Sequence, residues 1–299
     1  MQQAITYPSE VIEISADNEC VAPYREEIWL LVIVVPSLAK GGCEVAGRDR
    51  STKAHAKSIG AQGWPAQYFV GGMMKAVVVR ETGDVDVLRV QDLPRPIPLP
   101  REVVIQIAAC GVCTLDVSTR RGTYRRGVEL PLIPGHEISG RIVDVGSEVG
   151  EFKCGDRVAT TQRFSICGHC RLCRSGHETL CAKRRFLGQQ GFRGGYAEYV
   201  SVQVDNVAKV PDDVSDEHAA IAACAIGTSL NAVRDVGQVS IGERVMITGA
   251  GGGLGIHAVQ LARAAGAWVV AQTTSREKAN LLSELGAHEV LVRRRVKIN

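Results

Sequence analysis

Four cysteines give the clearest chemical signal in the sequence. Cys167, Cys170, Cys173 and Cys181 lie in the segment CGHCRLCRSGHETLC, as two Cys-x-x-Cys steps that share Cys170, followed by a seven-residue gap. Thiolates at this spacing converge on one small volume, and four of them complete a tetrahedral shell around zinc. Because a closed shell leaves no open coordination position, the pattern predicts a structural zinc.

Three other interpretations use closely spaced cysteines: a disulfide pair, an iron–sulfur cluster and a free-standing zinc knuckle that binds nucleic acid. The common bacterial iron–sulfur run ends with a shorter gap followed by proline, which this segment lacks. The net charge of +3 and the aromatic content of 5% argue against a nucleic-acid partner. Ten cysteines at metal-ligand spacings in a chain of 299 residues favour a reducing, cytoplasmic location over a disulfide framework.

The segments that flank the four cysteines help to decide between these interpretations of the cysteine spacing. Upstream lie CGVCTLD (Cys110–Asp116) and PGHEISG (Pro134–Gly140), and downstream lies AACAIGTS (Ala222–Ser229). In this order, together with the cysteine segment, they resemble the zinc-containing medium-chain dehydrogenase/reductase family of the alcohol dehydrogenase type. The resemblance covers about Met73 to Val292. It implies a chaperonin-10-like β-barrel catalytic domain followed by a Rossmann dinucleotide-binding domain.

The resemblance also implies a catalytic zinc with one open position. Its ligands would be Cys113, His136 and Cys224, and the bound ion would act as a Lewis acid while hydride moves to or from a nicotinamide. Asp116 matches the aspartate that orients the ligand histidine, and Glu137 matches the glutamate beside it. Taken singly, Cys224 is also compatible with a small buried hydrophobe and His136 with an ordinary loop histidine.

One residue departs from the alcohol-oxidising pattern. Family members of that type usually place Ser or Thr two residues after the first ligand cysteine, where the hydroxyl starts a proton relay. This chain has Leu115 there, and Thr114 is expected to point elsewhere. Because leucine cannot relay a proton, the departure favours a relative that reduces a conjugated double bond, such as the acryloyl-CoA reductases.

A glycine-rich loop predicts the dinucleotide site. It follows the apolar strand predicted at Arg244–Thr248 and precedes a helix predicted at Ile256–Ala265. The fingerprint reads Ala-x-Gly-x-x-Gly, with alanine for the first glycine, and the helix amino terminus should face the pyrophosphate. The predicted cofactor residues of this loop are Gly249, Gly252, Gly253, Leu254 and Gly255.

Cofactor preference is read at the end of the next strand, predicted at Trp268–Ala271. NAD-preferring proteins place an acidic residue there, whereas this chain has Thr273, Thr274, Ser275 and Arg276. Hydroxyls and a guanidinium suit a 2′-phosphate, which predicts NADP(H) rather than NAD(H). The alternative is that Arg276 is only an exposed residue in the first turn of a helix predicted at Arg276–Leu285.

The sequence divides into three segments. Residues 1–73 form an atypical N-terminal extension without a motif, and Met73 or Met74 could be the natural start. Residues 74–225 carry short runs that predict a small antiparallel barrel. Residues 226–299 alternate as βαβαβ and end with a strand predicted at Glu289–Val292, so we expect the first half of a dinucleotide domain, truncated at its C-terminus. The strands predicted in the barrel are Ala76–Arg80, Val103–Ala109, Gly140–Val145, Arg157–Thr160 and Tyr196–Val202.

These features together predict an α/β-plus-β oxidoreductase that holds two zinc ions and transfers hydride between NADP(H) and an alcohol or aldehyde. An enoyl-thioester reductase and a non-catalytic zinc-binding fragment are the alternatives. The partner would be a small-molecule substrate, and the family implies a homo-oligomer for a complete domain. The longest strongly apolar run, Trp29–Val35, is far too short to span a membrane.

Overall fold

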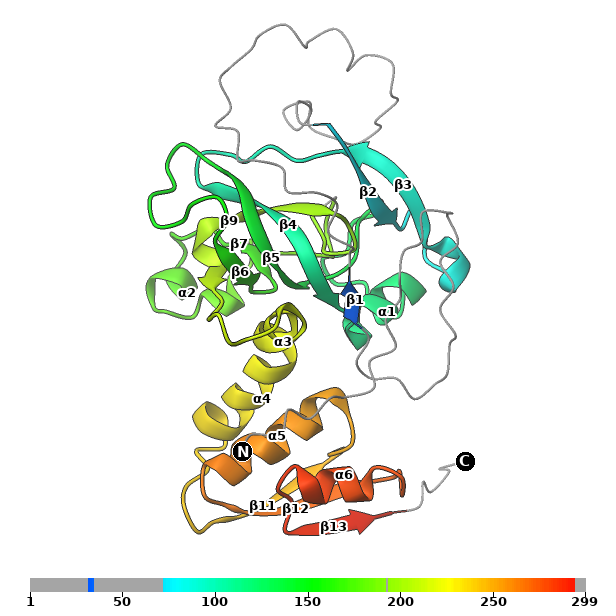
Figure 1. The fold of residues 1–299 in the computed structure, drawn as a ribbon, viewed down its shortest axis with the longest axis vertical. Helices are drawn as coiled ribbons and strands as arrows, with labels where there is room; N and C mark the ends of the chain where they lie inside the picture. The colour runs from blue at the N-terminus through cyan, green and yellow to red at the C-terminus, as the bar shows by residue number, and fades with distance from the viewer. Residues whose placement is uncertain (1–31, 35–71, 192, 294–299) are drawn as a thin grey trace, which may run out of the picture. The chain divides into compact units, whose positions relative to one another are not determined.

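The computed structural model describes residues 72–191 and 193–293, together with the backbone of residues 32–34. The chain divides into two compact units between Ala220 and Ile221. The first unit is built mainly from strands and the second from helices on a small parallel sheet (Figure 1).

A six-stranded antiparallel sheet frames the first unit. Its order is β1-β4-β5-β6-β10, and β9 pairs with β4 as well. The two longest strands, β4 and β5, cross the unit side by side (Figure 1). The strands of this sheet are β1 (Val32–Val34), β4 (Glu102–Gly111), β5 (Glu137–Val145), β6 (Arg157–Thr160), β9 (Tyr199–Gln203) and β10 (Val207–Lys209).

Two further strand pairs complete the first unit. One joins β2 (Met73–Val78) to β3 (Arg89–Pro94), and the other joins β7 (Arg163–Ser165) to β8 (Arg185–Phe186). Single bridges from Ala76 to Ala197 and from Val79 to Leu132 connect the β2 segment to the rest of the unit. Its helices are α1 (Thr114–Arg121), α2 (Arg171–Arg174) and the short turns η3 (Val85–Val87), η4 (Glu178–Leu180) and η5 (Val204–Asn206).

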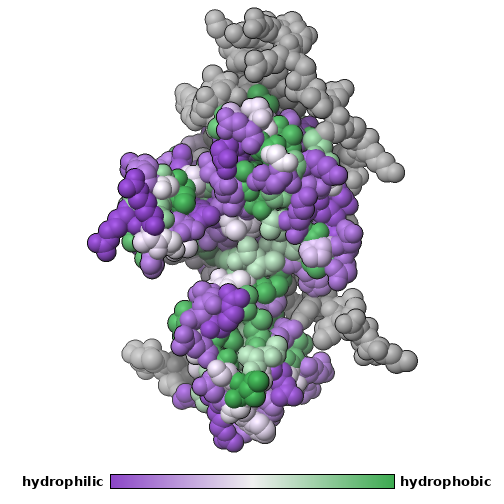
Figure 2. Space-filling model, turned by 90° about the vertical axis from the view of Figure 1, so that its left-hand side faces the viewer, coloured by the Kyte–Doolittle hydropathy of each residue, from purple (hydrophilic) through white to green (hydrophobic). Residues whose placement is uncertain are grey.

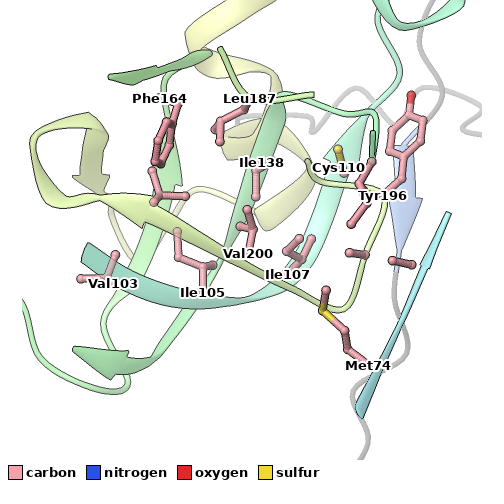
Figure 3. Close-up of a cluster of buried hydrophobic side chains, with 14 of the residues drawn as sticks. Met74, Val103, Ile105, Ile107, Cys110, Ile138, Phe164, Leu187, Tyr196 and Val200 are labelled. Atoms are coloured by element: carbon pink, nitrogen blue, oxygen red, sulfur yellow. The ribbon is translucent and has the colours of Figure 1, made fainter. Parts of the chain in front are cut away.

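The hydrophobic core of the first unit is formed by side chains at alternate strand positions, which point to one face of the sheet. Val103, Ile105 and Ile107 occupy every second position of β4, so they face one side of the sheet and are fully or almost fully buried. Figure 3 shows these side chains in one cluster with Ile138 and Val200 from β5 and β9. Each of the five predicted barrel strands lies in or beside an observed strand; Arg157–Thr160 matches β6 at both ends, and the other four differ at one end or both.

The N-terminal extension contains a strand that the sequence analysis did not predict. Backbone residues Val32–Val34 pair antiparallel with Ala109–Gly111 at the end of β4. This strand lies inside the apolar run Trp29–Val35. Three residues are too few to show a period of two, so the partner strand rather than the local pattern defines it.

The second unit has the predicted βαβαβ order. Its three parallel strands are β11 (Arg244–Thr248), β12 (Trp268–Thr273) and β13 (Glu289–Val292), paired in the order β11-β12-β13. The connecting helices are α5 (Gly253–Ala264) and α6 (Ala279–Glu284). Helical segments precede β11: α3 (Asp216–Ile221), whose last residue begins the unit, then η6 (Ala222–Ile226), α4 (Gly227–Leu230) and η7 (Asn231–Val236).

Apolar side chains are exposed on the second unit. Within the described residues, β11 pairs with β12 alone, and Met246 of β11 is 57% exposed. Val236 and Ile241 are exposed as well. Figure 2 shows hydrophobic residues at the surface of one face, among hydrophilic ones. No helix in the described part of the chain combines the length and apolar character that crossing a membrane requires.

Candidate metal centres and dinucleotide loop

The four predicted cysteines meet in one lobe of the first unit, residues 167–181, which we call the cysteine lobe. Their Sγ atoms all lie within 4.8 Å of one another. Cys170 is the N-cap of α2, and its sulfur accepts a hydrogen bond from the backbone N–H of Cys173. The backbone N–H of Cys170 in turn donates to the sulfur of Cys167 at 3.4 Å. A soft, closed donor set of this kind fits zinc.

The thiols of the cysteine lobe do not titrate alike. Backbone N–H groups of His169 and Cys170 lower the pKa of Cys167 to about 6. Desolvation, followed by the neighbouring thiols Cys170 and Cys181, raises the pKa of Cys173 to about 12. The first thiolate therefore forms readily, and the same crowding opposes further negative charge unless a cation is bound.

A second group gathers where β4 ends and β5 begins. Gly111 and Glu137 are directly opposite each other in the register of these two strands. Cys113 follows β4 as the N-cap of α1, and His136 immediately precedes β5. The ligand atoms of Cys113, His136 and Glu137 lie within 4.8 Å of one another. The antiparallel pairing thus brings together three of the predicted site residues from two sequence segments.

Asp116 connects the residues of this group. One of its oxygens, Oδ1, lies 3.2 Å from Nδ1 of His136 and accepts from the N–H of Gly135. The other, Oδ2, accepts from the N–H of Cys113 at 3.0 Å and from the hydroxyl of Tyr196 at 3.3 Å. Because an ionised carboxylate only accepts, this arrangement places a proton on Nδ1. The contact with Nδ1 of His136 is the one that the predicted orienting role of Asp116 requires.

The burial and hydrogen bonding of the Nε2 atom of His136 indicate whether these residues fit a metal ion. The side chain is 1% exposed, and Nε2 has no hydrogen-bond partner among the described residues. Burial by itself would lower the pKa of His136, but the charge and hydrogen bond of Asp116, with a smaller contribution from the neighbouring Cys113, outweigh it and raise the pKa to about 10. A buried nitrogen without a partner, beside a cysteine sulfur and a carboxylate, fits a cation that replaces the ring proton.

Gly111 is a site residue that the sequence analysis missed. A Cβ atom at this position would overlap the carboxylate of Glu137. Glycine therefore makes the room that the Glu137 side chain occupies, and Glu137 is 3% exposed. No local signal marks Gly111, because its constraint comes from a residue that is distant in sequence.

The remaining predicted ligand, Cys224, is distant from the others in sequence, whereas the relay position, Leu115, closely follows Cys113. Cys224 is half-buried in η6, within the second unit, and its role as a ligand stays a prediction. Leu115 is half-buried in the first turn of α1, and its N–H donates to the sulfur of Cys113. Thr114 is exposed, and its orientation relative to the site stays a prediction. Cys110, which matches no ligand position, is fully buried in β4.

The glycine loop of the second unit has the predicted strand–loop–helix setting. Gly249 has a φ of +65°, and Gly252 is the N-cap of α5, so Gly253 and Leu254 begin the helix. A Cβ atom at Gly255 would overlap the carbonyl oxygen of Gly249. Glycine there lets α5 begin close against the loop residues Gly249 and Ala250, and the free N–H groups of its first turn suit a phosphate.

The residues at the end of β12 differ in exposure. Thr273 is buried and its hydroxyl accepts from the N–H of Ser275 at 3.1 Å. Ser275 is half-buried, while Thr274 and Arg276 are exposed. The helix predicted from Arg276 is wrong at its start, because the chain turns through residues 274–278 and α6 begins at Ala279. Arg276 is therefore not a residue of the first helical turn.

Lys278 is a second residue that the sequence analysis missed. It is half-buried, and its Nζ donates to the carbonyl oxygen of Gly251 at 3.0 Å. The contact joins the end of β12 to the glycine loop and places a positive charge beside both. A sequence signal could have identified Lys278. It is a lysine that shortly follows β12, the first strand after the glycine-rich loop.

Comparisons with known proteins agree with this architecture. Residues 99–212 match the family model "Alcohol dehydrogenase GroES-like domain". An alcohol dehydrogenase of Geobacillus stearothermophilus is 43% identical over 218 residues, which are 73% of this chain and 63% of the relative. An acryloyl-coenzyme A reductase of Sulfurisphaera tokodaii is 34% identical over 73% of this chain and 64% of its own. The crystal structure of AibC is 44% identical with a TM-score of 0.70, covering 76% of this chain and 63% of that one.

The fold and these comparisons define a GroES-like domain of the alcohol dehydrogenase type, followed by a parallel βαβαβ unit. The chain belongs to the zinc-containing medium-chain dehydrogenase/reductase family. It spans somewhat less than two thirds of the length of the relatives that it matches.

Proposed function

We propose that the protein is a zinc-dependent oxidoreductase that transfers hydride between NADP(H) and an alcohol or aldehyde. The observation that carries the proposal is the buried His136 ring, held through Nδ1 by Asp116, with an unpartnered Nε2 beside Cys113. Residues 74–225 would supply this catalytic site, and residues 226–299 the first half of the cofactor site.

Cys224 is proposed as the third protein ligand of the catalytic zinc. The helical segment that carries it starts on the barrel: Ser139 donates to the carbonyl oxygen of Asp216 at 2.6 Å, and buried Ala220 packs against Ala109 of β4. Cys224 follows Ala220 by about one helical turn, so both occupy about the same face of the helical segment. This position supports a set of Cys113, His136 and Cys224 with a fourth position open.

A zinc ion in this set would supply a Lewis acid for the substrate oxygen. Asp116 would keep the His136 ring turned toward it, and Glu137 would sit beside it in the space that Gly111 provides. The cysteine lobe would hold a second zinc without an open position, which makes that ion structural. The chain would thus hold one reactive metal site and one stabilising metal site.

The glycine loop and the end of β12 support a preference for NADP(H). The nicotinamide cofactor would supply or accept the hydride. The first turn of α5 would receive the pyrophosphate, and Arg276 would meet a 2′-phosphate, since residues 273–276 offer hydroxyls and a guanidinium but no carboxylate. Lys278 would add charge near the loop while holding it through Gly251.

Replacing Arg276 by alanine is expected to weaken NADPH binding about tenfold more than NADH binding. A charge-assisted contact is worth about 1.5–3 kcal/mol, and the exposed setting of Arg276 favours the lower end. Titration of the chain with both cofactors, followed by fluorescence, measures the difference. Lys278→Met is the matched comparison: because Lys278 contacts the loop itself, its loss should weaken both cofactors. An equal loss for both in Arg276→Ala would refute the assigned role.

Leu115 supports a second candidate function, reduction of an enoyl thioester. It stands where alcohol-oxidising relatives carry a relay hydroxyl, and Thr114 next to it is exposed. A relative with 34% identity is named an acryloyl-coenzyme A reductase. Reduction of a conjugated double bond does not begin with removal of a hydroxyl proton, so a leucine would not impair it.

Replacing Leu115 by threonine is expected to raise the rate of alcohol oxidation about a hundredfold, the lower range for a positioned proton-transfer group. The assay uses a chimera in which the remainder of the Geobacillus relative follows Val292. Oxidation is tested with NADP⁺ and an alcohol, and reduction with NADPH and either an aldehyde or an acryloyl thioester. Leu115→Val is the control, because it changes the size of the side chain without adding a hydroxyl. Thioester reduction that exceeds aldehyde reduction in the unaltered chimera would favour the second candidate. No turnover with either substrate would leave the non-catalytic alternative.

A further inference from the structure

Tyr196 contacts the Asp116 carboxylate that holds the His136 ring, and it is not among the predicted site residues. It is 7% exposed, and its hydroxyl donates to Oδ2 of Asp116 at 3.3 Å. Figure 3 shows the ring at the margin of the buried hydrophobic cluster, with the hydroxyl directed away from the apolar side chains. Tyr196 thus places its one polar atom on the carboxylate that connects the residues of the second group.

The backbone of Tyr196 is fixed to the loop that carries His136. The N–H of Tyr196 donates to the carbonyl oxygen of Pro134, and the N–H of Gly195 donates to that of Gly135. A side chain at Gly194 would overlap the carbonyl oxygen of Ile133. Two consecutive glycines therefore let the 194–196 segment lie directly against the histidine loop.

The ring of Tyr196 is held as well. Gly135 has a φ of +92°, and a Cβ atom built there would lie 2.6 Å from the Tyr196 ring. The ring fills the space that the glycine leaves open, so its hydroxyl has little freedom to move. The tyrosine is consequently a rigid donor rather than a side chain that contacts Asp116 by chance.

Asp116 accepts from donors in three separate segments. They are the N–H of Cys113 in the α1 turn, the N–H of Gly135 with the His136 ring in the histidine loop, and the Tyr196 hydroxyl. Oδ1 faces the histidine loop, and Oδ2 is shared between Cys113 and Tyr196. Removing the tyrosine donor leaves Oδ2 with the Cys113 contact alone and lets the carboxylate rotate. Oδ1 fixes the orientation of the His136 ring through Nδ1. Rotation of the carboxylate would therefore turn Nε2 away from the direction in which it would bind a metal ion.

We propose that Tyr196 is a positioning residue for the metal site of Cys113 and His136, acting through Asp116. The inference rests on the proposed function, because it requires that this site hold a metal. Tyr196 touches no predicted ligand side chain in this role; it fixes the angle at which His136 presents Nε2. Outer contacts of metal ligands commonly change metal affinity 10- to 100-fold.

The test uses Tyr196→Phe in the full 299-residue chain, since phenylalanine keeps the ring and removes the hydroxyl. Zinc release to a chromogenic chelator is followed in time, and the metal-depleted site is then loaded with Co²⁺ for its visible spectrum. We expect release from the histidine site to be about tenfold faster, with an altered Co²⁺ spectrum. Release from the cysteine lobe should be unchanged, which makes the lobe an internal control. Tyr199→Phe, a hydroxyl removed from the same segment, should behave as the parent chain.

Two outcomes would overturn the inference while leaving the proposed function intact. One is an unchanged release rate and Co²⁺ spectrum in Tyr196→Phe. The other is equal acceleration at both zinc sites, which would mean that the hydroxyl supports the fold as a whole. A parent chain that binds zinc at the cysteine lobe alone would refute the proposed metal site itself, and the inference with it.

Discussion

Replacing Cys170 by serine is expected to remove the zinc of the cysteine lobe and to lower the free energy of unfolding by about 4 kcal/mol or more. Cys170 contributes a sulfur to the group, caps α2 and donates its own N–H to Cys167. Its loss therefore opens the closed shell and leaves three crowded thiols, one of which already resists deprotonation. Urea unfolding followed by circular dichroism, with zinc analysis on the same samples, measures both effects.

The matched control is Ser175→Ala, which removes a hydroxyl that contacts the carbonyl oxygen of Leu172 in the same lobe without touching the sulfur set. It should retain the lobe zinc and nearly all of the stability. If Cys170→Ser kept two zinc ions and the parent unfolding curve, the lobe would not be a structural metal site.

Replacing Cys224 by serine is expected to remove the other zinc and to reduce turnover of the chimera about a thousandfold. Loss of a Lewis acid at the reacting oxygen corresponds to about 4 kcal/mol of transition-state stabilisation. The parent chain should bind two zinc ions, and mild chelation should remove one of them, because a site with an open position exchanges faster than a closed shell. Cys224→Ser should start with one ion and resist the same treatment.

Cys110→Ala is the control for this experiment, since Cys110 is a buried cysteine of the same unit as His136 and is not a predicted ligand. It should keep both metal ions even if the core is somewhat weakened. If the chelation-resistant zinc disappeared in Cys224→Ser and the labile zinc disappeared in Cys170→Ser, the assignment of the two sites would be reversed.

The sequence was informative where a signal is local. Alternating apolar residues predicted β4 and β6, and glycines between a strand and a helix predicted the loop at Gly249–Gly255. The four lobe cysteines lie within one short segment, so their spacing alone predicted that they meet. In each case the residues that define the feature are near neighbours in the chain.

Features defined by distant partners were not predictable in the same way. Gly111 is constrained by Glu137 across the strand pair, and Tyr196 by Asp116, which lies 80 residues earlier. The strand Val32–Val34 exists through its pairing with β4. The start of α6 shifted because Thr273 and Ser275 form a local turn that helix periodicity does not reveal. The roles of such residues can be identified only from the tertiary structure.

The two candidate metal sites differ in how much chain must be closed to form them. The sulfur contact between Cys181 and Cys167 closes a loop of 14 residues, whereas the contact between Tyr196 and Asp116 closes one of 80. Loop-closure entropy grows as the logarithm of length, so the second costs about 1.5 kcal/mol more. The lobe can therefore capture its ion while the barrel is still forming and act as an early folding nucleus. The histidine site requires strands β4 and β5 to have paired, so metal uptake there would report the completion of folding.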